Sequence, residues 1–323
     1  MLLDFLAKTR HMKCMLTGAS GFIGRSLYPQ LKLLGHQVRC GLRHTGTPVD
    51  IHSADIVDIG SIDASTDWNR ALVDAEVVVH LAARAHVTNG RNFDPLSEFR
   101  IVNVEGTLNL AQQAADTGVC RFVFISSIGV NGSESFKPFT ETDMPAPQEP
   151  YAISKMEAEI GLFKIGERTG MEIVVIRPPL VYGAGAPGNF GRLLRAVKSG
   201  VPLPFGSVHN RRTLVGIENL VSLIANCIEH PSAANQVFLA GDGEDISTSD
   251  LLRFMGDSLN RRARLLPVPV PLLQAVGNLI GRRATVQKIC GNLQVDISKA
   301  RKVLGWEPPL STIEGLSRMA LEA

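Results

Sequence analysis

A glycine-rich turn near the N-terminus constrains the fold of this chain most strongly. The turn, at 17–24, follows a short apolar stretch and leads into a segment, 22–34, whose apolar residues recur at helical spacing. In such a turn Gly18 is expected to adopt unusual backbone angles, Gly21 to admit a pyrophosphate, and Gly24 to let helix and strand pack closely. The first N–H groups of the helix would then face the phosphates. A dinucleotide site is therefore predicted, the alternative being a glycine turn that binds no ligand.

A second motif combines a phenol with an ammonium group. Tyr151 and Lys155 lie four residues apart in a segment, 151–168, that is predicted to be helical, so they share one face. A nearby cation favours the phenolate and is expected to lower the pKa of Tyr151 from about 10, which suits proton transfer near neutrality. Such a pair is also common on solvated helices. However, an apolar strand upstream ends in Ser126 and Ser127, at the strand end where ligands bind in open α/β sheets.

The two motifs together predict an enzyme that moves hydride between a nicotinamide and an alcohol carbon. Apolar strands alternate with helical patterns along the first half of the chain, which predicts a parallel sheet covered by helices on both faces. The candidate strands are 13–17, 37–42, 54–57, 76–80, 120–126 and 171–176. After about Arg177 glycine and proline become frequent and the connections lengthen.

Composition narrows the class of protein. The chain has 323 residues, 45% of them apolar, and a formal charge of +2, which gives no general affinity for nucleic acid. Five scattered cysteines without a C-x-x-C pair indicate a reducing compartment and neither a disulfide framework nor a metal site. The first twelve residues lack the pattern of a signal peptide, so we expect a cytoplasmic protein.

One apolar stretch, 268–280, is too short and too rich in proline to span a bilayer, which needs about 20 apolar residues. An amphipathic surface anchor is one interpretation of it. The preferred one is a helix that packs on the substrate lobe or on a dimer face.

The motifs resemble those of the extended short-chain dehydrogenase/reductases, the NAD-dependent epimerase/dehydratase family that includes nucleotide-sugar epimerases, dehydratases and reductases. The matching pieces, in the family's order, are Gly18/Gly21/Gly24, Asp58-Ile59, His80-Leu81-Ala82-Ala83, Asn103 with Gly106-Thr107, Ser126-Ser127, Tyr151/Lys155 and 177–183. The resemblance implies a Rossmann-type doubly wound parallel sheet with a smaller, discontinuous α/β substrate lobe. The implied domains are 12–177 plus about 214–237, which bind the dinucleotide, and about 178–213 with 238–323, which bind the substrate.

The resemblance also implies which residues hold the cofactor. They are Gly18, Ser20, Gly21, Phe22, Ile23, Gly24, Arg43, Asp58, Ile59, Leu81, Ala82, Ala83, Asn103, Tyr151, Lys155 and Pro178. An NAD enzyme of this fold usually ends its second strand in Asp or Glu, which binds the ribose 2′-hydroxyl. Here that position is Leu42 and Arg43 follows, and a guanidinium pairs with a 2′-phosphate that a carboxylate would repel. The sequence thus favours NADP(H) over NAD(H), unless Arg43 is a solvated loop residue.

Two departures from family patterns, and one closer resemblance, guide the choice of reaction. Ser127 aligns with the catalytic Ser/Thr position, and Ile128-Gly129 replaces the Asp-Glu pair of the dehydratases, which disfavours dehydration. Leu180 replaces an Asn of the 4-epimerases. Three further segments, 188–190, 202–207 and 210–215, resemble bacterial UDP-4-keto-6-deoxy-N-acetylhexosamine 4-reductases of surface-polysaccharide synthesis.

We therefore predict an NADP(H)-dependent reductase of such a UDP-4-keto sugar, in which Tyr151 donates a proton, Lys155 tunes it and Ser127 orients the substrate oxygen. One alternative is a UDP-hexose or UDP-N-acetylhexosamine 4-epimerase with tightly held NAD. Another is a dinucleotide-binding sensor without turnover, although sensing alone would not require the Ser127, Tyr151 and Lys155 set.

The resemblance implies that Asn189 and Arg212 hold the UDP diphosphate, with a further contact from Arg282, Arg283 or Lys288. His86 either faces the sugar or is structural. The family also implies a homodimer through helices at about 94–117 and 151–168.

Overall fold

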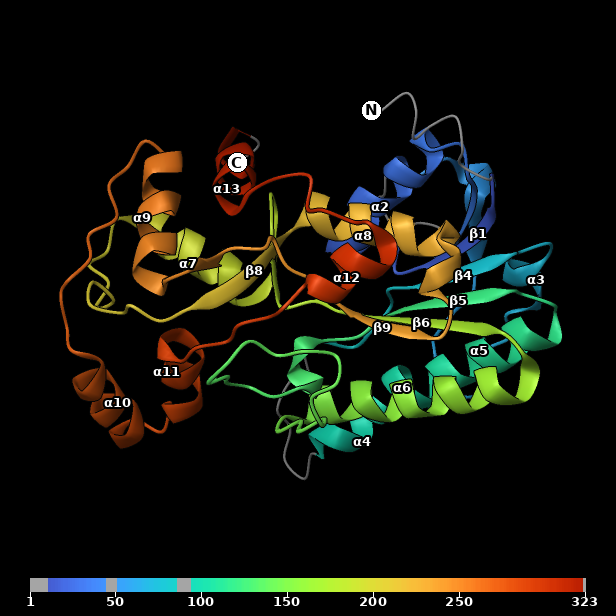
Figure 1. The fold of residues 1–323 in the computed structure, drawn as a ribbon, viewed down its shortest axis with the longest axis horizontal. Coiled ribbons are helices and arrows are strands. Elements are labelled where there is room, and N and C mark those ends of the chain that lie inside the picture. Colours follow the sequence, from blue (N-terminus) through green and yellow to red (C-terminus); the bar gives the residue numbers. More distant parts are fainter. Residues whose placement is uncertain (1–10, 45–50, 86–93, 322–323) are drawn as a thin grey trace.

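A computed structural model describes residues 11–44, 51–85 and 94–321 of the chain. Its centre is a seven-stranded parallel sheet in the order β3-β2-β1-β4-β5-β6-β9 (Figure 1). The strands are β1 (Lys13–Thr17), β2 (Gln37–Leu42), β3 (Ile56–Asp58), β4 (Val77–His80), β5 (Arg121–Ile125), β6 (Glu172–Arg177) and β9 (Gln236–Leu239). The predicted Rossmann-type sheet is confirmed, and the first two strands begin and end where the sequence placed them.

Helices cover both faces of this sheet (Figure 1). One face carries α2 (Phe22–Leu33), α8 (Ile217–Glu229) and α12 (Ser298–Leu304), and its core includes Leu27, Leu31, Leu220, Ile224 and Ala300. The opposite face carries α4 (Pro95–Arg100), the π-helix η2 (Ile101–Gly106), α5 (Thr107–Asp116) and α6 (Pro150–Thr169), with α3 (Asn69–Leu72) at the far end. Its core includes Trp68, Leu110, Phe122, Ala158 and Leu162. Because strands β1, β4, β5 and β6 are buried on both faces, they read as continuous apolar runs.

The strand order reverses at β1, which lies between β2 and β4. Register pairs Thr17 with Gly41 on one side and with His80 on the other, so three strands end at the same edge. In an open α/β sheet this reversal leaves a crevice beyond the carboxyl ends of the strands. The topology therefore places a ligand site above Thr17 and His80.

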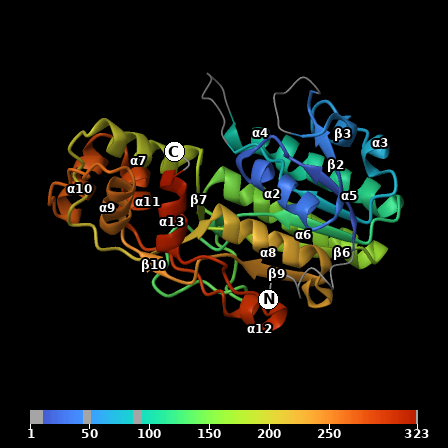
Figure 2. The ribbon, with the colours of Figure 1, turned by 90° about the horizontal axis from the view of Figure 1, so that it is seen from above.

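A smaller lobe lies at the carboxyl edge of the large sheet, at the left of Figure 1 and again in Figure 2, which is turned by 90°. It has a three-stranded sheet of order β10-β8-β7, formed by β7 (Leu180–Tyr182), β8 (Arg212–Gly216) and β10 (Asp245–Ile246). Its helices are α7 (Gly188–Ser199), α9 (Thr248–Ser258), α10 (Val270–Leu279), α11 (Arg283–Cys290) and α13 (Thr312–Leu321). Phe190, Leu252, Met255 and Leu316 form part of its core.

The domain boundaries of the sequence analysis remain a prediction. Strand pairing puts β8 in the small sheet, whereas the sequence assigned about 214–237 to the first domain. The pairing of β6 with β9 extends the large sheet to Leu239, two residues beyond the expected 237. The chain thus enters the small sheet at β7, and after β8 helix α8 returns it to the face of the large one.

Among the residues that the structure describes, no helix is both long and apolar enough to cross a membrane. Each of the five cysteines has a free thiol, and only Cys120 is exposed.

Candidate active site

The glycine turn forms one wall of a cavity of about 680 Å³ at the predicted crevice. Gly18 has a φ of +71°, and a Cβ there would lie 2.7 Å from the backbone nitrogen of Ala82. A Cβ at Gly24 would lie 2.2 Å from the Gly18 carbonyl oxygen, so both positions require glycine. Helix α2 begins at Gly21 without a side-chain cap and without an acidic residue in its first turn. Its N–H groups and partial positive charge are therefore available to an anion in the cavity.

A buried histidine fixes the edge of the sheet beneath this cavity. His80 lies between the hydroxyls of Thr17, at 2.7 Å, and Thr107, at 3.0 Å. Burial lowers the pKa of His80 to about 3, so the ring is neutral. The same Thr17 hydroxyl accepts the N–H of Ala82, which holds the backbone after β4 against the glycine turn. These hydrogen bonds hold the glycine turn and the backbone after β4 in position before a dinucleotide binds.

Half of the predicted cofactor residues line the cavity. They are Gly18, Ser20, Gly21, Arg43, Ile59, Leu81, Ala82 and Ala83. Arg43 is exposed at the end of β2, directly after Leu42, which is buried. Asp58 is exposed and accepts the N–H of Gly60, so Ile59 and not the carboxylate forms the wall.

The other predicted cofactor residues have different surroundings. Phe22 and Ile23 pack against the core beneath the glycine turn. Asn103 is fully buried: its amide donates to the Arg84 carbonyl and the Ser154 hydroxyl and accepts the N–H of Arg84. The Asn103 side chain therefore positions the backbone of the cavity wall. Their roles in binding stay predictions.

A second cavity, of about 810 Å³, adjoins the first, and Ala85 lines both. Ser127, Tyr151, Pro178 and Arg212 line it, so the structure brings the predicted catalytic and diphosphate-binding residues together. Ser127 caps the short 3-10 helix η3 (Ile128–Val130), and its hydroxyl accepts the N–H of Gly129 at 3.1 Å. Ser126 is buried, and its hydroxyl has no hydrogen-bond partner within the described part of the chain.

Helix α6 presents Tyr151 and Lys155 from its first two turns. Pro150 occupies its first turn, and Gly170 ends it in the left-handed conformation with a φ of 79°, which are favoured residues for these positions. The ring of Tyr151 packs edge-on against Phe99 at 5.8 Å between centroids. Lys155 is buried, and its Nζ donates to the Ile125 carbonyl at 2.8 Å and lies 4.3 Å from the Phe124 ring centroid.

The prediction that Lys155 lowers the pKa of Tyr151 is wrong for the chain by itself. Burial raises the pKa of Tyr151 to about 12. Burial also lowers the pKa of Lys155 to about 7, partly offset by Glu159, so near neutrality this lysine is only partly charged. Its Nζ lies 5.9 Å from the Tyr151 ring centroid and is turned toward β5. The sequence spacing set the shared helix face but could not show how strongly the interior desolvates both groups.

The substrate side of the second cavity is basic. Arg212, at the start of β8, donates from Nη1 to the carbonyls of Lys288, at 2.8 Å, and Gly291, at 3.1 Å. Lys288, one of three basic residues considered in 282–288, lines the cavity, as does Arg192 of α7. The Lys288 ammonium pairs with Glu149 at 2.6 Å, directly before the catalytic helix. Two of these cations, Arg192 and Arg212, therefore have no carboxylate partner among the described residues and suit an anionic substrate.

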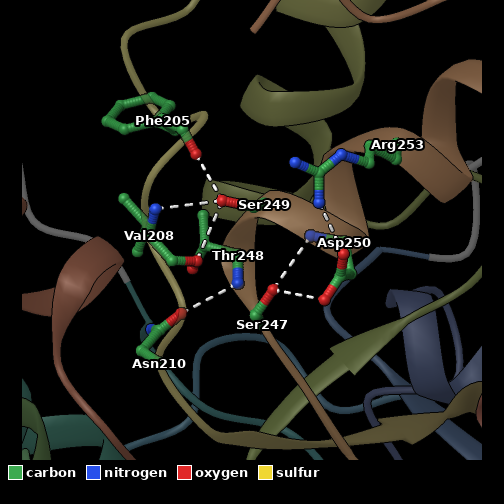
Figure 3. Close-up of polar contacts among 8 residues, drawn as sticks. All are labelled: Phe205, Val208, Asn210, Ser247, Thr248, Ser249, Asp250 and Arg253. Carbon is green, nitrogen blue, oxygen red and sulfur yellow. Dashed lines mark hydrogen bonds and ion pairs between the residues drawn. The ribbon is translucent and has the colours of Figure 1, made fainter. Parts of the chain in front are cut away.

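The N-terminus of α9 holds the segment 205–210 in place (Figure 3). It also contacts the end of α11, where the Thr248 hydroxyl donates to the Ile289 carbonyl. Ser249 Oγ lies 2.5 Å from the Phe205 carbonyl and accepts the N–H of Val208. Thr248 donates its N–H to Asn210 Oδ1, and Asn210 Nδ2 in turn donates to the carbonyls of Ile289 and Gly291. Asn210 and Arg212 thus cap the C-terminus of α11 together, which fixes Lys288 in the cleft.

The described residues do not place all of the predicted substrate contacts. His86 lies outside the described residues. Asn189 lies in the first turn of α7, and its side chain is outside the described part. Arg282 and Arg283 are exposed and do not line the cavity, and Arg211 donates its backbone N–H to Asn292 Oδ1.

Sequence reasoning missed Glu149, Arg192 and Thr248, all of which line the second cavity. They come from a loop and from two helices of the small lobe, and no spacing in the sequence connects them to the Tyr151 motif.

The sheet is doubly wound and carries an uncapped glycine turn at its reversal point. Beside it lies a cleft lined by Ser127 and Tyr151, and Lys155 is buried on the same helix as Tyr151. This combination defines a dinucleotide-dependent oxidoreductase or isomerase of the short-chain class. The sequence profile of the NAD dependent epimerase/dehydratase family matches residues 14–241. The chain belongs to this family.

Known relatives agree with this placement. A UDP-glucose 4-epimerase of Vibrio cholerae is 45% identical over 310 residues, which cover 95% of this chain and 94% of the relative. A GDP-6-deoxy-D-mannose reductase of Pseudomonas aeruginosa is 26% identical, covering 94% of both chains. The structure of the UDP-glucuronic acid 4-epimerase from Bacillus cereus in complex with NAD superposes with a TM-score of 0.76 at 24% identity, over 96% of each chain.

Proposed function

We propose that this protein is a 4-epimerase of UDP-hexoses or UDP-N-acetylhexosamines that keeps its nicotinamide cofactor through the reaction. The observation that carries the proposal is the position of Tyr151 and Ser127 on the wall of the basic cavity, beside the point where it adjoins the glycine cavity at Ala85. The 45% identical Vibrio relative, named a UDP-glucose 4-epimerase, supports epimerisation over the reduction predicted from sequence.

The residues of the chain supply binding, orientation and proton transfer. The α2 N-terminus and the glycine turn would hold the dinucleotide phosphates, and Arg212 with Arg192 the substrate diphosphate. Once ionised, which requires its pKa to fall from the value of about 12 in the chain by itself, Tyr151 would accept the proton of the C4 hydroxyl, and Ser127 would donate a hydrogen bond to the same oxygen. A nicotinamide held by the glycine turn would supply the hydride acceptor for C4.

The 4-keto sugar then turns in the cavity to present its other face. Tyr151 would then give the proton back to the C4 oxygen as the hydride is returned to C4, and would end ionised as it began. Such a cycle consumes no cofactor. A roomy cavity is required for this rotation, and its volume of about 810 Å³ is consistent with that need.

A second candidate, reduction of a UDP-4-keto sugar by NADPH, is favoured by Arg43. This exposed cation lines the first cavity directly after Leu42, which stands at the position where NAD enzymes of the fold carry a carboxylate. We propose a preference for NADP(H) independently of the reaction, because an epimerase with Arg43 would also bind a cofactor that carries a 2′-phosphate. The link to surface-polysaccharide synthesis likewise stays a prediction.

The test uses the purified protein with UDP-glucose, UDP-N-acetylglucosamine and a UDP-4-keto-6-deoxy sugar. Epimerisation is expected to give the C4 epimer by NMR with no net change in the reduced-nicotinamide absorbance. Stoichiometric loss of NADPH absorbance with the keto sugar, and no epimer from the other two, would establish the reductase instead. If neither reaction occurs with a folded, cofactor-loaded protein, both proposals fail.

The predicted homodimer remains a proposal as well. Ile101 and Ile160 are exposed apolar residues on the two helical segments expected to pair, η2 and α6. Exposed apolar residues on a helix pair suit an isologous interface.

A further inference from the structure

Helix α10 exposes an apolar stripe that the rest of the molecule does not cover. Leu272, Val276, Leu279 and Ile280 have the spacing i, i+4, i+7, i+8, so they lie along one side of the helix. All four are exposed, Leu279 by 86% and Ile280 by 62%. Leu266, on the chain that leads into the helix, is also exposed.

The helix packs on α11 through a different side. Gly277 is buried, and a Cβ there would lie 2.6 Å from Val286 of α11. At 100° per residue, Gly277 and the half-buried Leu273 are turned away from Leu279. Contact with α11 therefore leaves the apolar stripe free. The helical pair stands at the outer end of the small lobe, away from the large sheet (Figure 1).

The sequence on either side of α10 is basic. No Asp or Glu occurs from 258 to 295, and the same segment contains six basic residues, although the whole chain carries a formal charge of only +2. Arg261 lies against the end of α7, so it is not a neighbour of the stripe. The arginines that adjoin α10 in the chain are Arg282 and Arg283, which are exposed and follow its last residue, Leu279, by three and four positions.

We propose that α10 docks the protein on an anionic bilayer surface, with Leu272, Val276, Leu279 and Ile280 in the interface and the arginines at the lipid headgroups. A short helix with an apolar stripe and basic neighbours lies in the plane of a membrane, and anionic headgroups attract the cations. A second copy of the chain is a poorer occupant, because an isologous contact would oppose two segments of the same positive charge. At ten residues, α10 is too short to span the bilayer.

The experiment is co-sedimentation of the cofactor-loaded protein with vesicles. One set contains phosphatidylcholine only, and the other contains equal parts of phosphatidylcholine and phosphatidylglycerol. Binding is expected to the second set, to be at least about tenfold weaker to the first, and to weaken as salt is raised, because charge attraction is screened.

The test variant is the double substitution Leu279→Ser and Ile280→Ser, and its matched control is Leu33→Ser. Leu33 is 76% exposed on α2, on the large domain. The double variant is expected to lose about tenfold in vesicle affinity, since burying two apolar side chains supplies much of interfacial binding. The control variant should bind as wild type does. Both should retain turnover of a UDP-sugar in solution, because neither site touches the cavities.

Three results would overturn the proposal. They are absence of wild-type binding to the anionic vesicles, equal binding to both vesicle types, and unchanged binding by the double variant. Analytical ultracentrifugation without vesicles identifies the competing occupant: an oligomer that the double variant alone loses would make the stripe a subunit interface.

Discussion

Arg212 provides the sharpest test of where the substrate diphosphate binds. Its guanidinium donates hydrogen bonds to the Lys288 and Gly291 carbonyls, which replace part of the water that it loses on burial. None of the described carboxylates pairs with it. Burial lowers its pKa somewhat, which reflects a cation that is poorly solvated. A diphosphate would supply the missing anion, so Arg212→Ala is expected to weaken the binding of UDP itself.

The magnitude follows from the kind of contact. A hydrogen bond to a charged group contributes about 1.5–3 kcal/mol, which corresponds to about a 10- to 150-fold increase in the dissociation constant of UDP. Isothermal titration calorimetry measures it directly. Arg211→Ala is the matched control, because Arg211 is exposed and uses only its backbone N–H, toward Asn292.

A second variant separates direct contact from an effect through α11. Asn210→Ala removes two hydrogen bonds to the same helix end, from Asn210 to the Ile289 and Gly291 carbonyls, and Asn210 does not line the cavity. If UDP affinity falls equally in the Asn210 and Arg212 variants, Arg212 acts by fixing α11. Unchanged UDP affinity in the Arg212→Ala protein would refute the diphosphate site altogether.

Four further outcomes are expected. Tyr151→Phe should lower turnover by about 10²–10⁴-fold while cofactor binding persists, and near-normal turnover of the folded variant would exclude Tyr151 from the mechanism. Arg43→Ala should weaken NADPH by about 1–3 kcal/mol and leave NADH nearly unchanged by calorimetry; tighter wild-type binding of NADH than NADPH would contradict the predicted preference. The pKa of Lys155 is about 7 in the folded protein, below that of lysine in the unfolded chain. Burial of the charged lysine therefore lowers the free energy of unfolding most at acidic pH, and this free energy rises again as the pH increases above 7. Urea unfolding of wild type against Lys155→Met should therefore show the variant's relative advantage shrinking from pH 7 upward, and a constant difference would refute the shift. Ile160→Glu should convert a dimer to monomer in sedimentation velocity, unless the subunits pair elsewhere.

The large sheet was predictable because its strands are buried on both faces. Strands such as 13–17 and 37–42 carry a continuous apolar signal, and Gly18 and Gly24 stand where the backbone approaches too closely to leave room for a Cβ. Local chemistry alone fixes these features. The same holds for Tyr151 and Lys155, whose shared face follows from helical spacing.

The protonation state of the site could not be predicted in this way. Spacing placed the Lys155 ammonium near the phenol, but its partner is the Ile125 carbonyl on β5, which is distant in sequence. Desolvation depends on how many side chains from both faces of the sheet surround the pair. The burial of Lys155 and Tyr151 is therefore set by the assembled fold and not by their spacing in the sequence.

The ion pair of Lys288 with Glu149 is another contact between residues that are far apart in the sequence, and it lies on the substrate side of the site. Glu149 immediately precedes the helix that carries Tyr151, and Lys288 sits on the helix that Arg212 and Asn210 cap. The ion pair therefore links the two walls of the basic cavity. Both side chains are nearly half exposed, so the pair contributes little to stability and separates at low cost. A diphosphate bound at Arg212 would compete with Glu149 for Lys288, so this ion pair is expected to open when the substrate binds.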